Sequence, residues 1–316
     1  MIDRLETFVS AHPASRFRGE AMFTLAAAAY NAGECEKAEQ LFAALAHDAA
    51  GGNTRAEALF WAGKAAEAGG AGLKANATLN ELLSSADAGG ELTAEALLLQ
   101  GDVLARLGRY DAAIVAFDEV LARFPQTRQA AEARGRKGDC QYTLGESDPA
   151  RYEEALLSYR TLAGEAQAAD DLKIEAMYKV AKALERQGRA EAALDHYLEA
   201  VYAFLRMEDA TAEAAAWFTR AAYSAAAELG SRREFRRGFL YGNYRVGLFF
   251  LLKGDFTIRS FVLFFIFALL ELLFQRVNGQ VCCLFERFGG LAGAGVVAAD
   301  VHANVNSLVL RRFGVL

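Results

Sequence analysis

A short pattern of polar and apolar residues recurs six times in the first 230 residues of the chain. Each copy opens with a Glu-Ala pair that leads into an apolar helical pattern, as in GEAMF, AEALF and IEAMY. The glutamates are Glu20, Glu57, Glu95, Glu132, Glu175 and Glu213. Their separations are 37, 38, 37, 43 and 38 residues, and the longest contains a Ser-Asp-Pro turn within ESDPAR. This near-constant period predicts a chain built from one repeated unit.

A second helix follows in each unit, because an alanine lies 18 residues after the glutamate and four residues before a large apolar side chain. The pairs are Ala38 with Phe42, Ala75 with Leu79, Ala113 with Phe117 and Ala193 with Tyr197, and the longer unit gives Ala155 with Tyr159. A turn glycine lies between the two features, at Gly33, Gly70, Gly108, Gly145 and Gly188. Each unit is therefore predicted to be a helix, a glycine-terminated turn and a second helix whose alanine allows close approach.

The segment AEALLLQGDVLARLGRYDAAIVAFDEVLARFPQT, residues 94–127, shows the unit most clearly. It resembles a tetratricopeptide repeat (TPR), and the matching positions are Gly101, Leu107, Gly108, Tyr110, Ala113, Phe117 and Pro125. The longer period is similar to bacterial envelope TPR arrays such as the outer-membrane assembly lipoprotein and the Tol-Pal-associated coordinator proteins. The resemblance implies an all-α, TPR-type solenoid of about six helix pairs over residues 1–230. Only three prolines occur, which agrees with an all-helical chain.

The resemblance also implies a concave groove lined by the first helices, which would bind a peptide or protein segment. The residues expected to face this groove are Glu20, Glu57, Glu95, Glu132 and Glu175 with the apolar Phe23, Phe60, Leu98 and Tyr178. An acidic ladder of this kind would suit a basic or amide-rich partner. Two other interpretations stay open: the glutamates complement helix dipoles in first turns, and the apolar residues belong to the core.

The search for catalytic chemistry finds little. The four histidines are far apart, no Cys-x-x-Cys pair occurs, and no Walker-type phosphate loop is present. GAGVVA at residues 293–298 matches a loose dinucleotide fingerprint without a strand–helix unit around it. We therefore expect a non-catalytic scaffold with no cofactor, no metal, no nucleic-acid partner and no small-molecule substrate.

The N-terminal segment LETFVSAHP looks like the second helix of a repeat whose first helix is missing, which leaves Leu5 and Phe8 without their usual neighbour. Either this helix caps the array or an upstream segment precedes it, and such a segment could have held a signal peptide. An alternative function follows from this end: a structural subunit of a larger envelope assembly, docking end to end through its repeats.

Composition changes after Gly230. Residues 231–316 carry 11 Lys/Arg and 5 Asp/Glu, a net charge of +6 within a chain whose total is −6, and 13 of the 22 phenylalanines. Residues 256–274 form a mainly apolar run of 19 residues, with Arg259 and Glu271 near its ends, which is long enough as a helix to cross a bilayer once. Its uncharged part, residues 260–270, is short enough for a buried helix instead. If the run spans a bilayer, the surrounding Lys and Arg would place the repeats on the cytoplasmic face of the membrane, whereas an upstream signal would make them periplasmic.

Two other interpretations of the tail stay open. The repeat register is lost abruptly near RREFRR, residues 232–237, and a shifted reading frame would produce such a change. A soluble domain of unfamiliar type is the third interpretation. The predicted organisation is thus a TPR solenoid over residues 1–230 and a hydrophobic, basic tail over residues 231–316 that is a membrane segment, a non-native sequence or a further domain.

Overall fold

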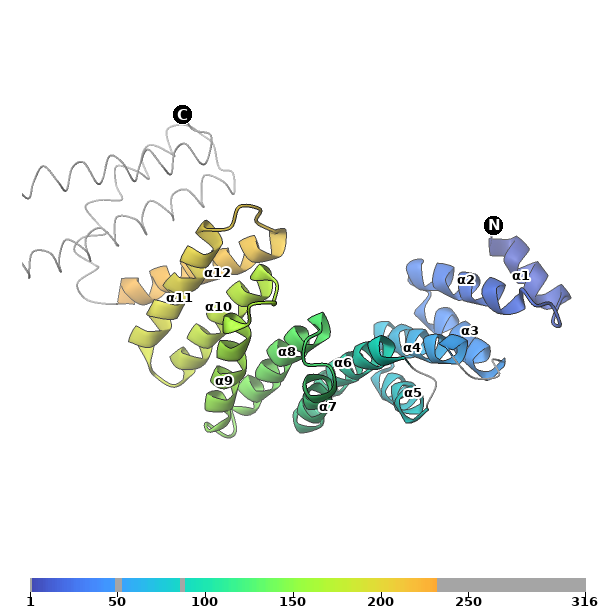
Figure 1. Cartoon of the computed structure of the whole chain (residues 1–316), viewed down its shortest axis with the longest axis horizontal. Helices are drawn as coiled ribbons and strands as arrows, with labels where there is room; N and C mark the ends of the chain where they lie inside the picture. Colours follow the sequence, from blue (N-terminus) through green and yellow to red (C-terminus); the bar gives the residue numbers. More distant parts are fainter. Residues whose placement is uncertain (1, 49–52, 86–88, 232–316) are drawn as a thin grey trace, which may run out of the picture. The chain divides into compact units, whose positions relative to one another are not determined.

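The computed structural model describes residues 2–48, 53–85 and 89–231, which belong to one compact unit, Met1–Arg232. Twelve α-helices and no strands occur in these residues, and Figure 1 follows them in chain order. The helices are α1 (Ile2–Ala11), α2 (Arg18–Asn31), α3 (Cys35–Asp48), α4 (Asn53–Ala68), α5 (Gly72–Ser84), α6 (Gly90–Arg106), α7 (Tyr110–Arg123), α8 (Arg128–Leu144), α9 (Arg151–Gly164), α10 (Asp170–Arg186), α11 (Ala190–Leu205) and α12 (Ala212–Ser231).

The helices form an array in which packing is between neighbours. Every helix contacts the next one along the chain, and α4, α6, α8, α10 and α12 also contact one another in that order. These five helices therefore form one layer, which we call the inner layer. Five helix pairs, from α2–α3 to α10–α11, are complete in the described residues, with α1 before them and α12 after them. A partner for α12, which the expected six pairs require, would lie outside the described residues.

Four of the five predicted turn glycines have the left-handed backbone that ends a helix. Gly33, Gly70, Gly108 and Gly188 have φ angles from 73° to 79°. The residue after each glycine donates its N–H to a carbonyl five positions earlier, as Arg109 does to Leu104 at 2.9 Å. This is the Schellman motif, which satisfies helix-end carbonyls and favours glycine because its φ is positive.

Gly145 lies in the predicted turn after α8, but it does not have the left-handed backbone of the other four. Its φ is −59°, within the right-handed helical region. A Cβ atom at this position would lie 2.5 Å from the ring of Tyr152, so close packing explains the glycine. This turn belongs to the longer repeat, where the added residues change the path between α8 and α9.

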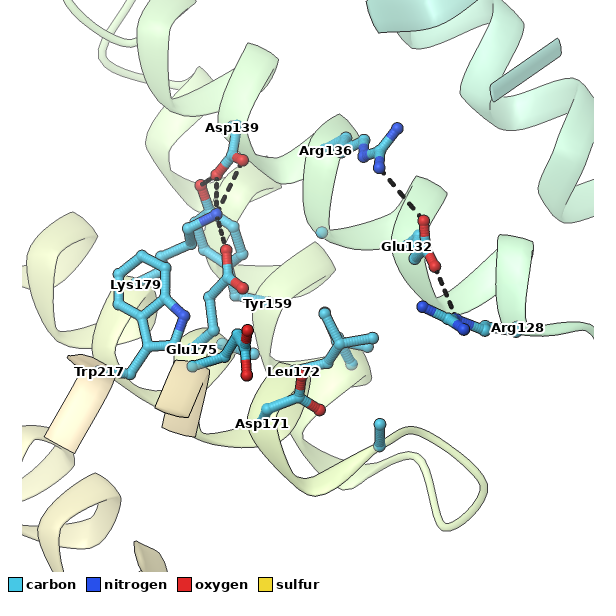
Figure 2. A pocket seen from close by; sticks show the side chains of 15 residues that line it. Arg128, Glu132, Arg136, Asp139, Tyr159, Asp171, Leu172, Glu175, Lys179 and Trp217 are labelled. Atoms are coloured by element: carbon cyan, nitrogen blue, oxygen red, sulfur yellow. Dashed lines mark hydrogen bonds and ion pairs between the residues drawn. The ribbon is translucent and has the colours of Figure 1, made fainter. Parts of the chain in front are cut away.

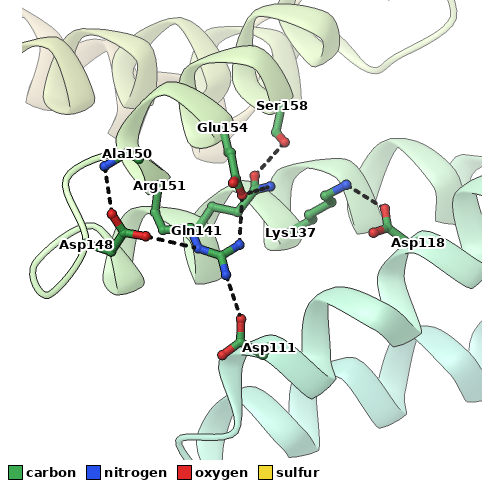
Figure 3. A network of polar contacts seen from close by, with 9 residues as sticks. All are labelled: Asp111, Asp118, Lys137, Gln141, Asp148, Ala150, Arg151, Glu154 and Ser158. Carbon is green, nitrogen blue, oxygen red and sulfur yellow. Dashed lines mark hydrogen bonds and ion pairs between the residues drawn. The ribbon is translucent and has the colours of Figure 1, made fainter.

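Polar contacts hold the inserted turn in place, as Figure 3 shows. The Arg151 guanidinium bonds Asp111 of the preceding repeat at 3.2 Å and Glu154 of its own helix at 3.0 Å. The carboxylate of Asp148 accepts the backbone N–H of Ala150 at 3.1 Å. The insertion is therefore ordered and tied to α7.

The predicted contact between the two helices of each pair is confirmed. All five alanines of the second helices are buried with at most 1% exposure, and their large partners four residues later are at most 2% exposed. In α6 the small residue facing this site is Gly101, where a Cβ atom would lie 2.3 Å from the Phe117 ring. Absence of a side chain on α6 therefore lets the aromatic ring of α7 enter the helix–helix contact.

The first helix, α1, packs against α2, so Leu5 and Phe8 are half-buried. Glu6 of α1 also pairs with Lys37 of α3 at 2.8 Å.

The predicted tail, residues 231–316 with the apolar run 256–274, lies outside the described residues except for Ser231. None of the helices in the described part combines the length and the apolar character needed to cross a bilayer.

Candidate functional site

The predicted site glutamates lie on α2 and on four helices of the inner layer, and most of them lie beyond the first turn of their helix. Glu20 is in the first turn of α2. The helices of Glu57, Glu95, Glu132 and Glu175 begin four or five residues earlier, at Asn53, Gly90, Arg128 and Asp170. Complementing the helix dipole at its start is therefore a wrong explanation for these four glutamates, since that effect is confined to the first turn.

The glutamates of this repeated column differ in their ion-pair and hydrogen-bond partners. Glu132 accepts hydrogen bonds from Arg128 at 2.9 Å and Arg136 at 3.2 Å, and Glu175 pairs with Lys179 at 2.6 Å. Glu20 and Glu57 are exposed and Glu95 is half-buried. The acidic ladder is therefore partly neutralised by the protein itself.

The predicted apolar column divides between core and inner surface. Phe60 and Leu98 are each 7% exposed and belong to core clusters. Phe23 is half-buried and meets Phe42 edge to face, at 5.3 Å between ring centroids. Tyr178 is half-buried and touches the rings of Tyr197 and Trp217 at 5.6 and 5.5 Å. Burial thus assigns Phe60 and Leu98 to the core, whereas Tyr178 packs against the half-buried ring of Trp217.

A cavity of about 690 Å³ opens over the inner layer between α8, α10 and α12, and we call it the inner cavity. Its α8 wall carries Arg128, Glu132 and Arg136, and Figure 2 shows the glutamate between the two arginines. The facing α10 and α12 wall carries Asp171, Glu175, Lys179, Glu213 and Trp217. Tyr159 and Leu162 of α9 complete the lining. Of the residues predicted as site residues, Glu132 and Glu175 lie in this cavity.

Ion pairs join successive inner helices at one repeated register. Asp102, seven residues after Glu95, pairs with Arg136, four residues after Glu132. Asp139, seven residues after Glu132, pairs with Lys179, four residues after Glu175, at 2.7 Å. The same two columns of the repeat therefore connect α6 to α8 and α8 to α10.

Lys179 is the centre of a polar cluster in the cavity, and its own side chain is 18% exposed. Its ammonium donates to Asp139 and Glu175, and Asp139 also accepts the Tyr159 hydroxyl at 2.7 Å (Figure 2). Burial lowers the pKa of Lys179, but the two carboxylates outweigh burial and leave this pKa raised. Burial and the adjacent Asp139 raise the pKa of Tyr159 well above its usual value. The lysine is thus charged and the tyrosine neutral, and together they fix α8, α9 and α10.

Asp102 has the most strongly shifted carboxyl group in this region. Burial raises its pKa to about 6, repulsion from Glu132 and Asp139 adds to the effect, and Arg136 opposes it. Desolvation exceeds the attraction of a single arginine that also pairs with Glu132.

Three solvent-accessible polar groups of the cavity lining have no side-chain partner among the described residues. The carboxylates of Asp171 and Glu213, in the first turns of α10 and α12, have no ion-pair or side-chain hydrogen-bond partner there. The indole N–H of Trp217 has no acceptor there either, although its ring contacts Tyr178 and lies 4.3 Å from the Arg220 guanidinium carbon.

Comparisons with known proteins agree with this architecture. A family model described as tetratricopeptide repeat matches residues 73–127 and 98–170. This part of the chain consists of tetratricopeptide repeats. No curated protein matches the chain.

Solved structures that match the chain include YrrB, described as a TPR protein with an unusual peptide-binding site. It is 18% identical, covers 64% of this chain and 94% of its own, and gives a TM-score of 0.47. MamA is 18% identical over 57% of this chain and 94% of its own, with a TM-score of 0.46. A putative kinesin light chain with TPR-like repeats from Podospora anserina is 12% identical over 61% of this chain and 95% of its own, with a TM-score of 0.48.

Sequence reasoning missed the cavity residues that lie one position beyond the column it chose. The apolar column was placed three residues after each glutamate, whereas the cavity is lined by the residues at four: Arg136, Lys179 and Trp217. In α4 the same TPR position is Trp61, with the Lys64 ammonium 4.6 Å from its ring. The sequence carries charged or tryptophan side chains four residues after several of the glutamates, and this pattern could have predicted that the position faces the surface.

The described residues contain no cluster suited to a metal ion, and their one buried cysteine is poorly suited to thiol chemistry. No three side chains of His, Cys, Asp or Glu gather there to hold a metal ion. Cys140 is buried, and its burial raises the thiol pKa to about 12, so the nucleophilic thiolate is scarce near neutral pH.

Proposed function

We propose that this protein is a non-catalytic scaffold that holds a peptide or protein segment against the inner layer of its repeats, with the inner cavity as the main contact. TPR proteins commonly mediate protein–protein interactions, and stacked repeats create extended surfaces suited to that role. The observation that carries the proposal is the cavity itself. A volume of about 690 Å³ with two polar walls and an indole ring is large enough for several residues of a peptide.

Three accessible polar groups of the cavity, the Asp171 and Glu213 carboxylates and the Trp217 indole N–H, support the same surface. A free indole N–H can donate to a backbone carbonyl, and the two free carboxylates can accept from a partner's donors. The cavity is also held in shape by the Lys179 group and by the ion pairs between inner helices. Such preorganisation reduces the ordering cost of binding.

Site-specific photo-crosslinking tests which face binds. A photoreactive phenylalanine analogue at Leu172 would line the cavity, and the same analogue at Leu157 of α9, which is 70% exposed, serves as the matched control. We expect adducts with partner polypeptides in cells from position 172 and none from position 157. Adducts from position 157 alone would place the partner on the outer helices and contradict the proposal.

A further inference from the structure

The charges of the inner cavity indicate which chemistry the partner brings. Five carboxylates and three cations line it, for a net formal charge of −2. Glu132 is shared by Arg128 and Arg136, and Lys179 is shared by Asp139 and Glu175. The cations are therefore engaged within the protein, and the unbalanced charge belongs to Asp171 and Glu213.

We infer that the segment bound in the inner cavity carries a lysine or arginine whose cation is neutralised by Asp171 and Glu213. This inference rests on the proposed function and specifies its ligand class. A basic side chain supplies the donors that these carboxylates lack, and the adjacent peptide carbonyl supplies an acceptor for the Trp217 indole. An acidic segment would instead add negative charge to a cavity that already has an excess of it.

The two carboxylates come from different positions of the repeat: Glu213 is the last glutamate of the repeated column, whereas Asp171 lies four residues before Glu175. Both lie in first turns, on α10 and α12, and they share the cavity with Trp217, four residues after Glu213. An aromatic ring beside free carboxylates also suits the aliphatic stem of lysine or arginine, which packs on apolar surface while its charge stays solvated.

The test begins with the full-length chain probed against an array of synthetic ten-residue peptides of mixed sequence. We expect the bound peptides to be enriched in lysine or arginine. The best arginine peptide is then compared with its citrulline counterpart, which keeps the shape and loses the charge. Because the chain has two tryptophans, the Trp61→Phe variant leaves Trp217 as the reporter of binding by fluorescence.

Matched variants test whether the peptide's cation binds beside Asp171 and Glu213. The double variant Asp171→Asn, Glu213→Gln should weaken binding of the arginine peptide roughly tenfold or more, and it should bind the citrulline peptide as the parent does. Glu91→Gln is the control, because Glu91 is also a first-turn carboxylate on an inner helix and does not line the cavity.

Each outcome separates the inference from the proposed function. Peptides that bind without enrichment in basic residues, or whose binding neither alters Trp217 fluorescence nor depends on Asp171 and Glu213, would overturn the inference and leave the scaffold function standing. Failure of every peptide to bind, together with no adduct from position 172, would overturn both.

Discussion

Individual glycines decide how closely the two helices of a repeat approach. A Cβ atom at Gly101 would lie 2.3 Å from Phe117, and one at Gly138 would lie 2.5 Å from Tyr159. Gly63 occupies the same position of its repeat, and a Cβ atom there would lie 3.0 Å from the Leu79 side chain. The large residue of the second helix thus fills the space that a missing side chain leaves on the first.

Replacing Gly101 with alanine should destabilise the protein by about 1–3 kcal/mol, because Phe117 is fully buried and cannot move aside without strain. Urea unfolding followed by circular dichroism measures the change. Gly164→Ala is the control: it is also helical and has no atom within 4 Å of the new Cβ, so it should be neutral or stabilising by up to about 1 kcal/mol. Equal effects of both substitutions would contradict the close contact.

A second residue-scale prediction concerns Asp102 and pH. Its pKa is raised from 3.8 to about 6, so ionisation is harder in the folded state and stability falls as pH rises through that range. Ionising Asp102 completely removes about 3 kcal/mol of stability, because each tenfold change in proton affinity corresponds to about 1.4 kcal/mol. Relative to Asp102→Asn, which does not titrate, the wild-type chain should gain about 1 kcal/mol between pH 7 and pH 5. A difference between the two proteins that does not change with pH would refute the raised pKa.

At the scale of helices, periodicity in the sequence was enough to predict the repeat unit but not which face each helix presents. The alanine and aromatic positions of the second helices are buried as expected, because contact within a pair depends on local register. The cavity residues at Arg136, Lys179 and Trp217 depend on how successive inner helices pack, and a shift of one residue turns a helix by about 100°. The cross-repeat pairs with Asp102 and Asp139 could be found only from that packing.

The link between α8 and α10 should be measurable as a coupling energy. A double-mutant cycle with Asp139→Asn and Lys179→Met should give about 1 kcal/mol or more, because the Lys179 side chain is only 18% exposed and the pair shares contacts with Tyr159 and Glu175. The exposed pair Glu119 and Arg123 on α7, taken through the same cycle, should give about 0.5 kcal/mol or less. A coupling at Asp139 and Lys179 as small as that of the exposed pair would show that this contact does not join the repeats.

At the scale of the whole described unit, stability should be distributed along the chain. Contacts connect each helix to the next, and each inner helix to its inner neighbours. In such an array stability is approximately a sum of repeat terms and nearest-neighbour terms, so damage at one place should spread only to adjacent repeats. The inner cavity, between α8, α10 and α12, is therefore expected to depend on the later repeats rather than on α2 to α5.

Ala221→Asp tests this distribution by placing a charge at a fully buried site on α12, a change that should unfold this helix locally. Amide hydrogen exchange should accelerate in α12 and, less strongly, in α10 and α11, which contact it, while α2 to α7 keep their protection. Ala96→Asp, at an equally buried site on α6, is the control and should accelerate exchange on both sides, from α4 to α8. Because the cavity needs Trp217 of α12, Ala221→Asp should also abolish peptide binding while the early repeats stay folded. Uniform acceleration from α2 to α12 would instead show that the unit unfolds as a single cooperative body.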